Sequence, residues 1–236
     1  MRPQALATAL RAAGFEMKSV AASGDCFYDC IDMQLSGQDR PEPLADAGAM
    51  RDTVASSITD EMYELMKVFA QAGVEGYEFL THHRAPQSLE EFRAFARRRG
   101  KDTGAGQCLW ADEHAISTVA GLAGIRLLIF DEQASSRGSR SGRVRDGGAA
   151  TADSRFVCVG EASVTRVALL HRSRRQHYSP IFFDGCGVLE ANELPAATRA
   201  LWPTLGSSLS VESAAPEPPE RKDERDAKRR RSCATS

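Results

Sequence analysis

The sequence has no excess of positive charge and no long apolar run. Its 30 Lys and Arg side chains are balanced by 32 Asp and Glu side chains, which leaves a formal charge of −2 with neutral histidines. That balance argues against a nucleic-acid binder, whose surface needs a strong positive excess. No apolar stretch approaches the ~20 residues of a membrane span. Because Arg11 interrupts the apolar stretch that ends at Leu10, we also expect no secretory signal and a protein that acts in the cytoplasm.

Signatures of a metal site and of a disulfide framework are also missing. The six cysteines form no C-x-x-C pair, and the five histidines complete no zinc-finger spacing. His82 and His83 have no Cys or carboxylate partner at metal-ligand spacing, so we expect no metal site. Disulfide frameworks belong to small secreted chains, and this chain has 236 residues. We therefore expect free thiols, each to be judged by its own surroundings.

Helical and strand periodicities alternate along the chain, which predicts an α/β (α+β) protein. The Ser88 to Glu91 spacing is that of a capping box, which opens a helix. Residues 38–48 and 101–107 are expected to be loops. We expect the strands over 155–160 and 164–171 to form a hairpin. The spacing predicts helices over residues 2–13, 26–37, 50–70, 88–96 and 110–122, and strands over residues 15–20, 125–130, 155–160, 164–171 and 177–183.

Two segments have too few large apolar residues to pack a core. Residues 132–154 contain only Val144 as a large aliphatic side chain, so we expect a mobile surface insertion there. Residues 206–236 are rich in Ser, Pro and charge, and we expect a disordered tail. One domain over residues 1–205 remains. The basic run at 228–231 in the tail is either a nuclear-import patch, which would place the protein in the nucleus, or an ordinary solvated run.

The first candidate catalytic residue is Cys26. Gly24 permits a sharp backbone turn immediately before it, because a glycine has no Cβ to obstruct one. Cys26 then opens the helix predicted behind the turn, where free N–H groups and the helix dipole favour a thiolate. The same N–H groups are suited to hold the oxyanion of a tetrahedral intermediate. The alternative is a small buried residue that merely starts a helix.

The second candidate is His177, at the start of the last predicted strand. A histidine at a strand end can reach across a cleft, act as the general base for a thiol and later protonate the leaving amine. The alternative is a surface histidine in a basic loop. Together, a Cys on a strand-turn-helix and a late strand-borne His describe the two halves of a papain-type dyad.

Residues 14–31, with Ser-Gly-Asp-Cys-Phe-Tyr at 23–28, resemble the Cys box of the ovarian-tumour (OTU) family of cysteine proteases. His177-Tyr178 resembles the family's His box at the end of its closing strand. The resemblance covers roughly residues 5–185. Segments between the two boxes are similar in the expected order: 50–51, 88–92, 110–113, 125–130 and 167–171.

The resemblance implies a papain-like OTU fold, with a small central β-sheet flanked by helices, and a deubiquitinase activity without metal or organic cofactor. Cys26 would attack the carbonyl after the ubiquitin C-terminus, His177 would activate it, and the backbone N–H groups of Asp25 and Cys26 would bind the oxyanion. The partner would be ubiquitin or a polyubiquitin chain, bound by a monomer. Two alternatives remain: a catalytically weak ubiquitin-binding module, and a protease for another ubiquitin-like modifier.

The sequence departs from the family at the group that orients the histidine. The family commonly places Asp three residues before the Cys, where this chain has Ser23, or Asp or Asn two residues after the His, where it has Ser179. A hydroxyl accepts a hydrogen bond from the imidazole but carries no charge to stabilise an imidazolium. Ser179 is the favoured candidate because it shares a strand face with His177, whereas Ser23 is also placed to cap the Cys26 helix.

Overall fold

The computed structural model describes residues 10–74, 77, 80, 85–104, 107–131, 156–173 and 177–200. The expected insertion at 132–154, the tail at 206–236, and His82 and His83 lie outside the described residues. So does most of the helix expected over 2–13.

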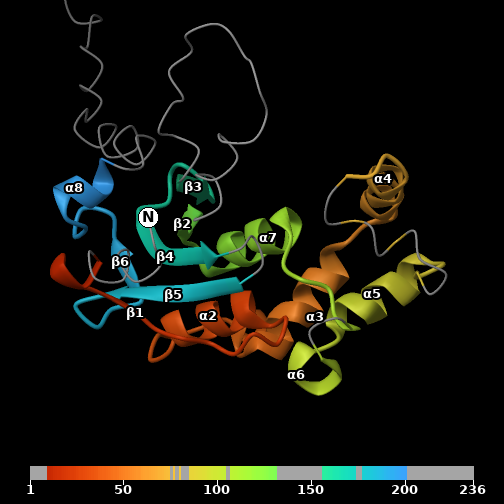
Figure 1. The fold of residues 1–236 in the computed structure, drawn as a ribbon, viewed down its shortest axis with the longest axis horizontal. Helices are drawn as coiled ribbons and strands as arrows, with labels where there is room; N and C mark the ends of the chain where they lie inside the picture. The colour runs from red at the N-terminus through yellow and green to blue at the C-terminus, as the bar shows by residue number, and fades with distance from the viewer. Residues whose placement is uncertain are drawn as a thin grey trace, which may run out of the picture.

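Six strands and seven α-helices are described, together with one short 3-10 helix. Figure 1 shows α2 running along the sheet beneath β5, and α3, α4, α5 and α6 gathered beyond one end of the sheet. The elements are β1 (Phe15–Met17), α2 (Cys26–Gln34), η1 (Glu42–Leu44), α3 (Ala47–Ser57), α4 (Asp60–Gln71), α5 (Leu89–Arg97), α6 (Gly100–Thr103), α7 (Glu113–Ala123), β2 (Arg126–Asp131), β3 (Phe156–Val159), β4 (Arg166–Ser173), β5 (His177–Phe183), β6 (Val188–Glu190) and α8 (Ala196–Arg199).

The strands form one mixed sheet in the order β1-β5-β4-β2-β3, and β6 also pairs with β4. Strands β2 and β4 are parallel, while the other pairs are antiparallel. The predicted α/β class is therefore confirmed. The expected hairpin is wrong, because β2 lies between β3 and β4. Strand β2 is buried on both faces of the sheet, at Leu127, Leu128 and Ile129. A strand buried on both faces needs a hydrogen-bonded partner strand on each edge.

The helix predicted over 26–37 is α2, and it packs its apolar face on the sheet. Phe27, Cys30, Ile31 and Leu35 are buried in one cluster with residues of β2, β4 and β5. Near the end of the helix, the Gln34 side-chain amide donates to the carbonyl oxygens of Leu169 (2.8 Å) and Ile181 (3.2 Å). Those two residues face each other across β4 and β5. A single amide therefore fixes α2 to the two strands at once. 

The helix expected over 50–70 is two helices, which corrects the prediction. Ile58 has an extended backbone, and the Thr59 hydroxyl accepts a hydrogen bond from the Met62 N–H at 3.3 Å. A threonine that caps a new helix competes with continuing the old one. The expected loops are also partly wrong: residues 38–48 contain η1 and the start of α3, and residues 101–107 contain most of α6.

The ends of two other helices follow their capping residues. The Ser88 hydroxyl accepts from the Glu91 N–H at 3.2 Å, which confirms the predicted start of α5. Asp112 caps α7 by accepting from the Ala115 N–H at 2.9 Å, so this helix begins at Glu113 rather than at 110. Among the residues with described positions, no helix has both the length and the apolar character needed to cross a membrane.

Candidate functional site

Cys26 is the first residue of α2, and its side chain is buried, at 2% exposure. Gly24, two residues earlier, has a φ of +91°, a backbone conformation that favours glycine. Asp25 is the N-cap residue, but its side chain makes no capping hydrogen bond. The predicted turn and helix start are therefore confirmed, and the sulfur lies at a helix N-terminus.

The start of β5 brings His177 to the same place. The backbone N–H of Tyr178 donates to the Cys26 sulfur at 3.5 Å. Since a backbone nitrogen lies about 2.4 Å from the preceding Cα, the Cα of His177 is within about 6 Å of that sulfur. The His177 Nδ1 atom is buried and has no hydrogen-bond partner among the described residues. The structure thus brings the backbones of the two predicted catalytic residues together.

Burial sets the charge state of both groups. It raises the pKa of the Cys26 thiol above its usual 9.0, although the N–H groups of Tyr178 and Phe27 act in the opposite direction. The nearby Asp29 carboxylate also raises this pKa. Burial lowers the pKa of His177 below 6.5. At neutral pH the resting pair is therefore a thiol and a neutral imidazole. This corrects the expected thiolate, because burial outweighs the N–H groups that stabilise negative charge on the sulfur. The thiol must lose its proton during the reaction.

A buried ion cluster holds the turn before Cys26. Asp25 and Arg51 are both fully buried, and the Arg51 Nε donates to the Asp25 carboxylate at 2.7 Å. Arg99 and the backbone N–H of Lys101 donate to its second oxygen at 3.3 and 3.1 Å. Burial works to raise the pKa of Asp25, but the Gly100 and Lys101 N–H groups and Arg51 together hold it below 3.8. Asp25 is therefore an ionised anchor.

Arg51 links this turn to two other segments of the chain. Its Nη2 donates to the Gly24 carbonyl at 2.9 Å, and its Nη1 donates to the carbonyls of Ala96 at 3.0 Å and Leu109 at 2.9 Å. This role of Arg51 was not predicted from the sequence. A signal was present, because the buried residues of α3 recur at helical spacing and Arg51 stands within that apolar stripe. A charged residue at such a position needs buried partners.

The two serines considered as orienting groups have different surroundings. The Ser23 hydroxyl accepts from the Asp25 N–H at 3.3 Å, so this N–H, expected at the oxyanion, is engaged in the structure. The Ser23 carbonyl lies 3.9 Å from the Cys108 sulfur. Ser179 lies on β5, two residues after His177 and opposite His171 of β4, and is half-buried. The position of Ser179 leaves it the better candidate partner for His177.

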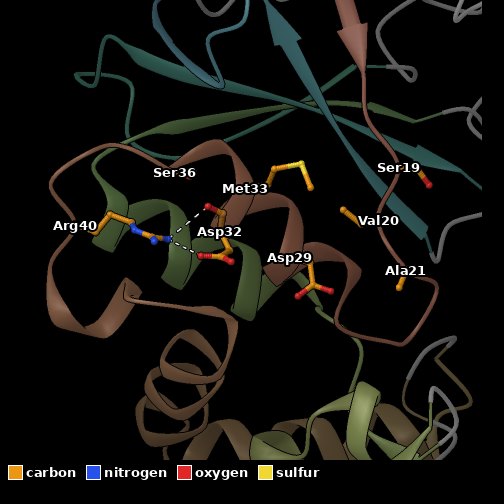
Figure 2. Close-up of a pocket in the computed structure, with 8 residues that line it drawn as sticks. All are labelled: Ser19, Val20, Ala21, Asp29, Asp32, Met33, Ser36 and Arg40. Carbon is orange, nitrogen blue, oxygen red and sulfur yellow. Dashed lines mark hydrogen bonds and ion pairs between the residues drawn. The ribbon is translucent and has the colours of Figure 1, made fainter.

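A groove of about 540 Å³ follows the outer side of α2. Figure 2 shows the segment that precedes the Cys26 turn on one side of this groove and Arg40 on the other. Arg40 is paired with Asp32 at 2.5 Å. Neither Cys26 nor His177 lines this groove. Its lining residues are Ser19, Val20, Ala21, Asp29, Asp32, Met33, Ser36 and Arg40.

Five of the six cysteines lie in the described part of the chain. These five form no disulfide with one another: Cys26, Cys30, Cys108, Cys158 and Cys186. Within the described ranges, no group of three or more His, Cys, Asp or Glu side chains is placed to hold a metal ion.

The sequence matches no family model, and no curated protein matches it. Several solved structures are distantly similar. An OTU domain in complex with ubiquitin shares 11% identity at a TM-score of 0.45, over 84% of this chain and 88% of that one. An OTU deubiquitinase from Wolbachia pipientis shares 15% identity at a TM-score of 0.38, over 78% of this chain and 93% of that one. The Hazara virus OTU bound to ubiquitin shares 16% identity at a TM-score of 0.34, over 72% of this chain and 81% of that one. With TM-scores below 0.5, these likenesses do not establish the family.

Proposed function

We propose that this chain is an OTU-like cysteine protease that hydrolyses the isopeptide or peptide bond after the ubiquitin C-terminus. One observation carries the proposal: the Tyr178 N–H contacts the Cys26 sulfur, which brings a cysteine at a helix N-terminus next to the strand that begins with His177. The sequence resemblance of these two segments to the Cys and His boxes of OTU proteases supplies the substrate class. We further propose that the protein acts as a monomer in the cytoplasm, without a metal or an organic cofactor.

His177 would take the thiol proton as the Cys26 sulfur attacks the carbonyl carbon. Its buried Nδ1, which has no other partner among the described residues, is suited to accept that proton. The carbonyl oxygen becomes an oxyanion in the tetrahedral intermediate. The C–N bond then breaks, the imidazolium gives its proton to the leaving amine, and a thioester remains on Cys26. Water, deprotonated by His177, releases the ubiquitin carboxylate.

The oxyanion would be held at the N-terminus of α2. The N–H of Cys26 and the positive end of the helix dipole favour negative charge at this point. The Asp25 N–H can contribute only if its 3.3 Å bond to the Ser23 hydroxyl opens when substrate binds. We therefore propose the Cys26 N–H as the principal donor and the Asp25 N–H as a second donor.

A catalytically weak ubiquitin-binding module is the second candidate. Burial keeps both members of the pair neutral, since it raises the pKa of Cys26 and lowers that of His177. The two positions that the family uses to orient the histidine hold uncharged serines, Ser23 and Ser179. Both features lower the rate expected for the dyad without affecting the ability of the surface to bind ubiquitin.

A ubiquitin probe with a C-terminal electrophile separates the two candidates. We expect the probe to form a covalent adduct that mass spectrometry locates at Cys26. Cys26→Ala should abolish the adduct, whereas Cys186→Ala, which changes an exposed thiol outside the site, should leave it unchanged. Binding of ubiquitin without an adduct would favour the binding module. An adduct at Cys30 or Cys108, or no interaction at all, would contradict the proposal.

A further inference from the structure

Three polar side chains form a row across the sheet beside the candidate site. Asp131 of β2 is in register with Arg172 of β4, and Arg172 is in register with Tyr178 of β5. Side chains opposite each other on adjacent strands point to the same face of a sheet. Arg172 donates to the Asp131 carboxylate at 2.5 Å and to the Tyr178 hydroxyl at 3.4 Å. One guanidinium therefore joins the ends of three strands.

Tyr178 connects this row to the candidate nucleophile. Its side chain is buried, and its ring packs edge-on against the ring of Phe27 at a centroid distance of 5.4 Å. Its hydroxyl is held by Arg172, and its backbone N–H donates to the Cys26 sulfur. A tyrosine fixed at both its ring and its hydroxyl has little freedom to rotate or slide, so its backbone N–H stays in place.

We propose that Asp131, Arg172 and Tyr178 are positioning residues that hold the Tyr178 N–H against the Cys26 sulfur. A donor aimed at sulfur stabilises the thiolate more than the thiol, because a hydrogen bond to a charged acceptor is the stronger one. The inference deepens the proposed function, since that thiolate is its nucleophile. His177 directly precedes Tyr178, so the same row also fixes the start of the strand that carries the proposed base.

The other ionisable groups near Cys26 do not belong to this row. Asp29, on α2 itself, disfavours the thiolate, and Asp25 is neutralised by Arg51 and Arg99. Cys30 lies one helical turn further along α2 and is fully buried. His177 approaches from β5. Changes in Arg172 or Tyr178 leave the charges of all these groups as they are, so a change in thiol reactivity would report on the row.

The pH dependence of Cys26 alkylation by iodoacetamide tests the proposal without ubiquitin. Fragment spectra distinguish adducts at Cys26 from those at Cys30, and the exposed Cys186 serves as an internal reference. In Arg172→Met we expect the apparent pKa of Cys26 to rise by roughly 0.5 to 1 unit, which slows alkylation at pH 7 roughly three- to tenfold. Tyr178→Phe should shift it in the same direction.

Two further variants separate geometry from charge. Arg172→Lys keeps the positive charge but loses the planar fork, so we expect an intermediate shift. Arg166→Met removes an arginine at the other end of β4 that donates to Gln38 at 2.6 Å, and it should leave the Cys26 profile unchanged. Tyr178→Phe changes no charge at neutral pH. A shift in that variant therefore indicates positioning rather than electrostatics.

Three results would overturn the proposal. The first is an unchanged profile in both Arg172→Met and Tyr178→Phe. The second is a shift in Arg172→Met that Arg172→Lys fully reverses while Tyr178→Phe stays at the wild-type value, because charge alone would explain it. The third is a shift in the apparent pKa of Cys26 in Arg166→Met that equals the shift in Arg172→Met. If Arg172→Met does not fold, Tyr178→Phe decides the question. Failure of the ubiquitin probe to label the wild-type protein would refute the proposed function and leave these profiles valid.

Discussion

Gly100 is the position at which one added methyl group should damage the site most directly. A Cβ built there would lie 1.7 Å from the Ser23 carbonyl oxygen and 3.1 Å from the Cys108 sulfur. Real Cβ atoms essentially never come closer than 3.0 Å to another heavy atom, so Gly100→Ala must separate α6 from the Ser23 backbone by at least about 1.3 Å. Ser23 begins the turn that leads to Cys26, and the displacement must therefore pass into the site.

The expected effects are large enough to measure. Overpacking typically costs about 1–3 kcal/mol, and a clash with backbone places Gly100→Ala near the upper value. For a chain of this size, about 3 kcal/mol lowers Tm by roughly 6–12 °C. A misplacement of about 1 Å can cost a hundredfold in rate, so labelling by the ubiquitin probe should slow by about that factor.

Gly121 provides the matched control. It lies in α7 with no atom within 4 Å of an added Cβ. Gly121→Ala should therefore raise stability by about 0.5–1 kcal/mol through helix propensity and leave labelling unchanged. A Gly100→Ala protein with the wild-type Tm and labelling rate would refute the assigned packing of α6 against the Cys26 turn.

Two further predictions concern pH and the orientation of His177. Because the pKa of Asp25 is held below 3.8, its contribution to stability should be complete above about pH 5 and lost as pH falls through 3.8 towards the lower folded value. Denaturant titrations should show proton uptake on unfolding in that pH range. The pKa of Asp46 is also lowered, so this residue contributes to the pH dependence in the same direction. The titrations are therefore made in a protein that carries Asp46→Asn. If Ser179 orients His177, Ser179→Ala should lower kcat/KM and Ser179→Asp should raise it, whereas Ser23→Ala should have the smaller effect. Unchanged kcat/KM in both alanine variants would exclude both hydroxyls.

The two ends of the candidate site were predictable because each has a local signal. Gly24 followed by an apolar helical pattern gave the position of Cys26, and the apolar run after His177 gave β5. The break between α3 and α4 was missed because the apolar spacing continues from Val54 through Ile58 into the next helix. The signal that competed with it was Thr59, a capping residue followed by acidic side chains.

Contacts between distant segments were not predictable from local patterns. Asp25 and Arg51 both appear polar in the sequence, and charged residues are seldom fully buried unless they are paired. The pairing depends on α3 packing beside the Cys26 turn, which no local spacing encodes. The pairing of β3 with β2 rather than with β4 was not predictable for the same reason. Strand order depends on which edge of a buried strand still lacks a hydrogen-bonded partner, and local spacing does not encode this.

The bonds of Arg51 also bear on when Cys26 reaches its position in the fold. The turn at 23–25 has few contacts of its own and is held by residues 26 to 85 positions away, through Arg51, Lys101 and Cys108. Contacts of such separation form late, because the intervening chain must first be ordered. It follows that Cys26 remains an ordinary thiol in a partly folded chain, including one still being synthesised. Burial of this sulfur is thus a property of the completed fold, and protection of Cys26 from alkylation can report the last stage of folding.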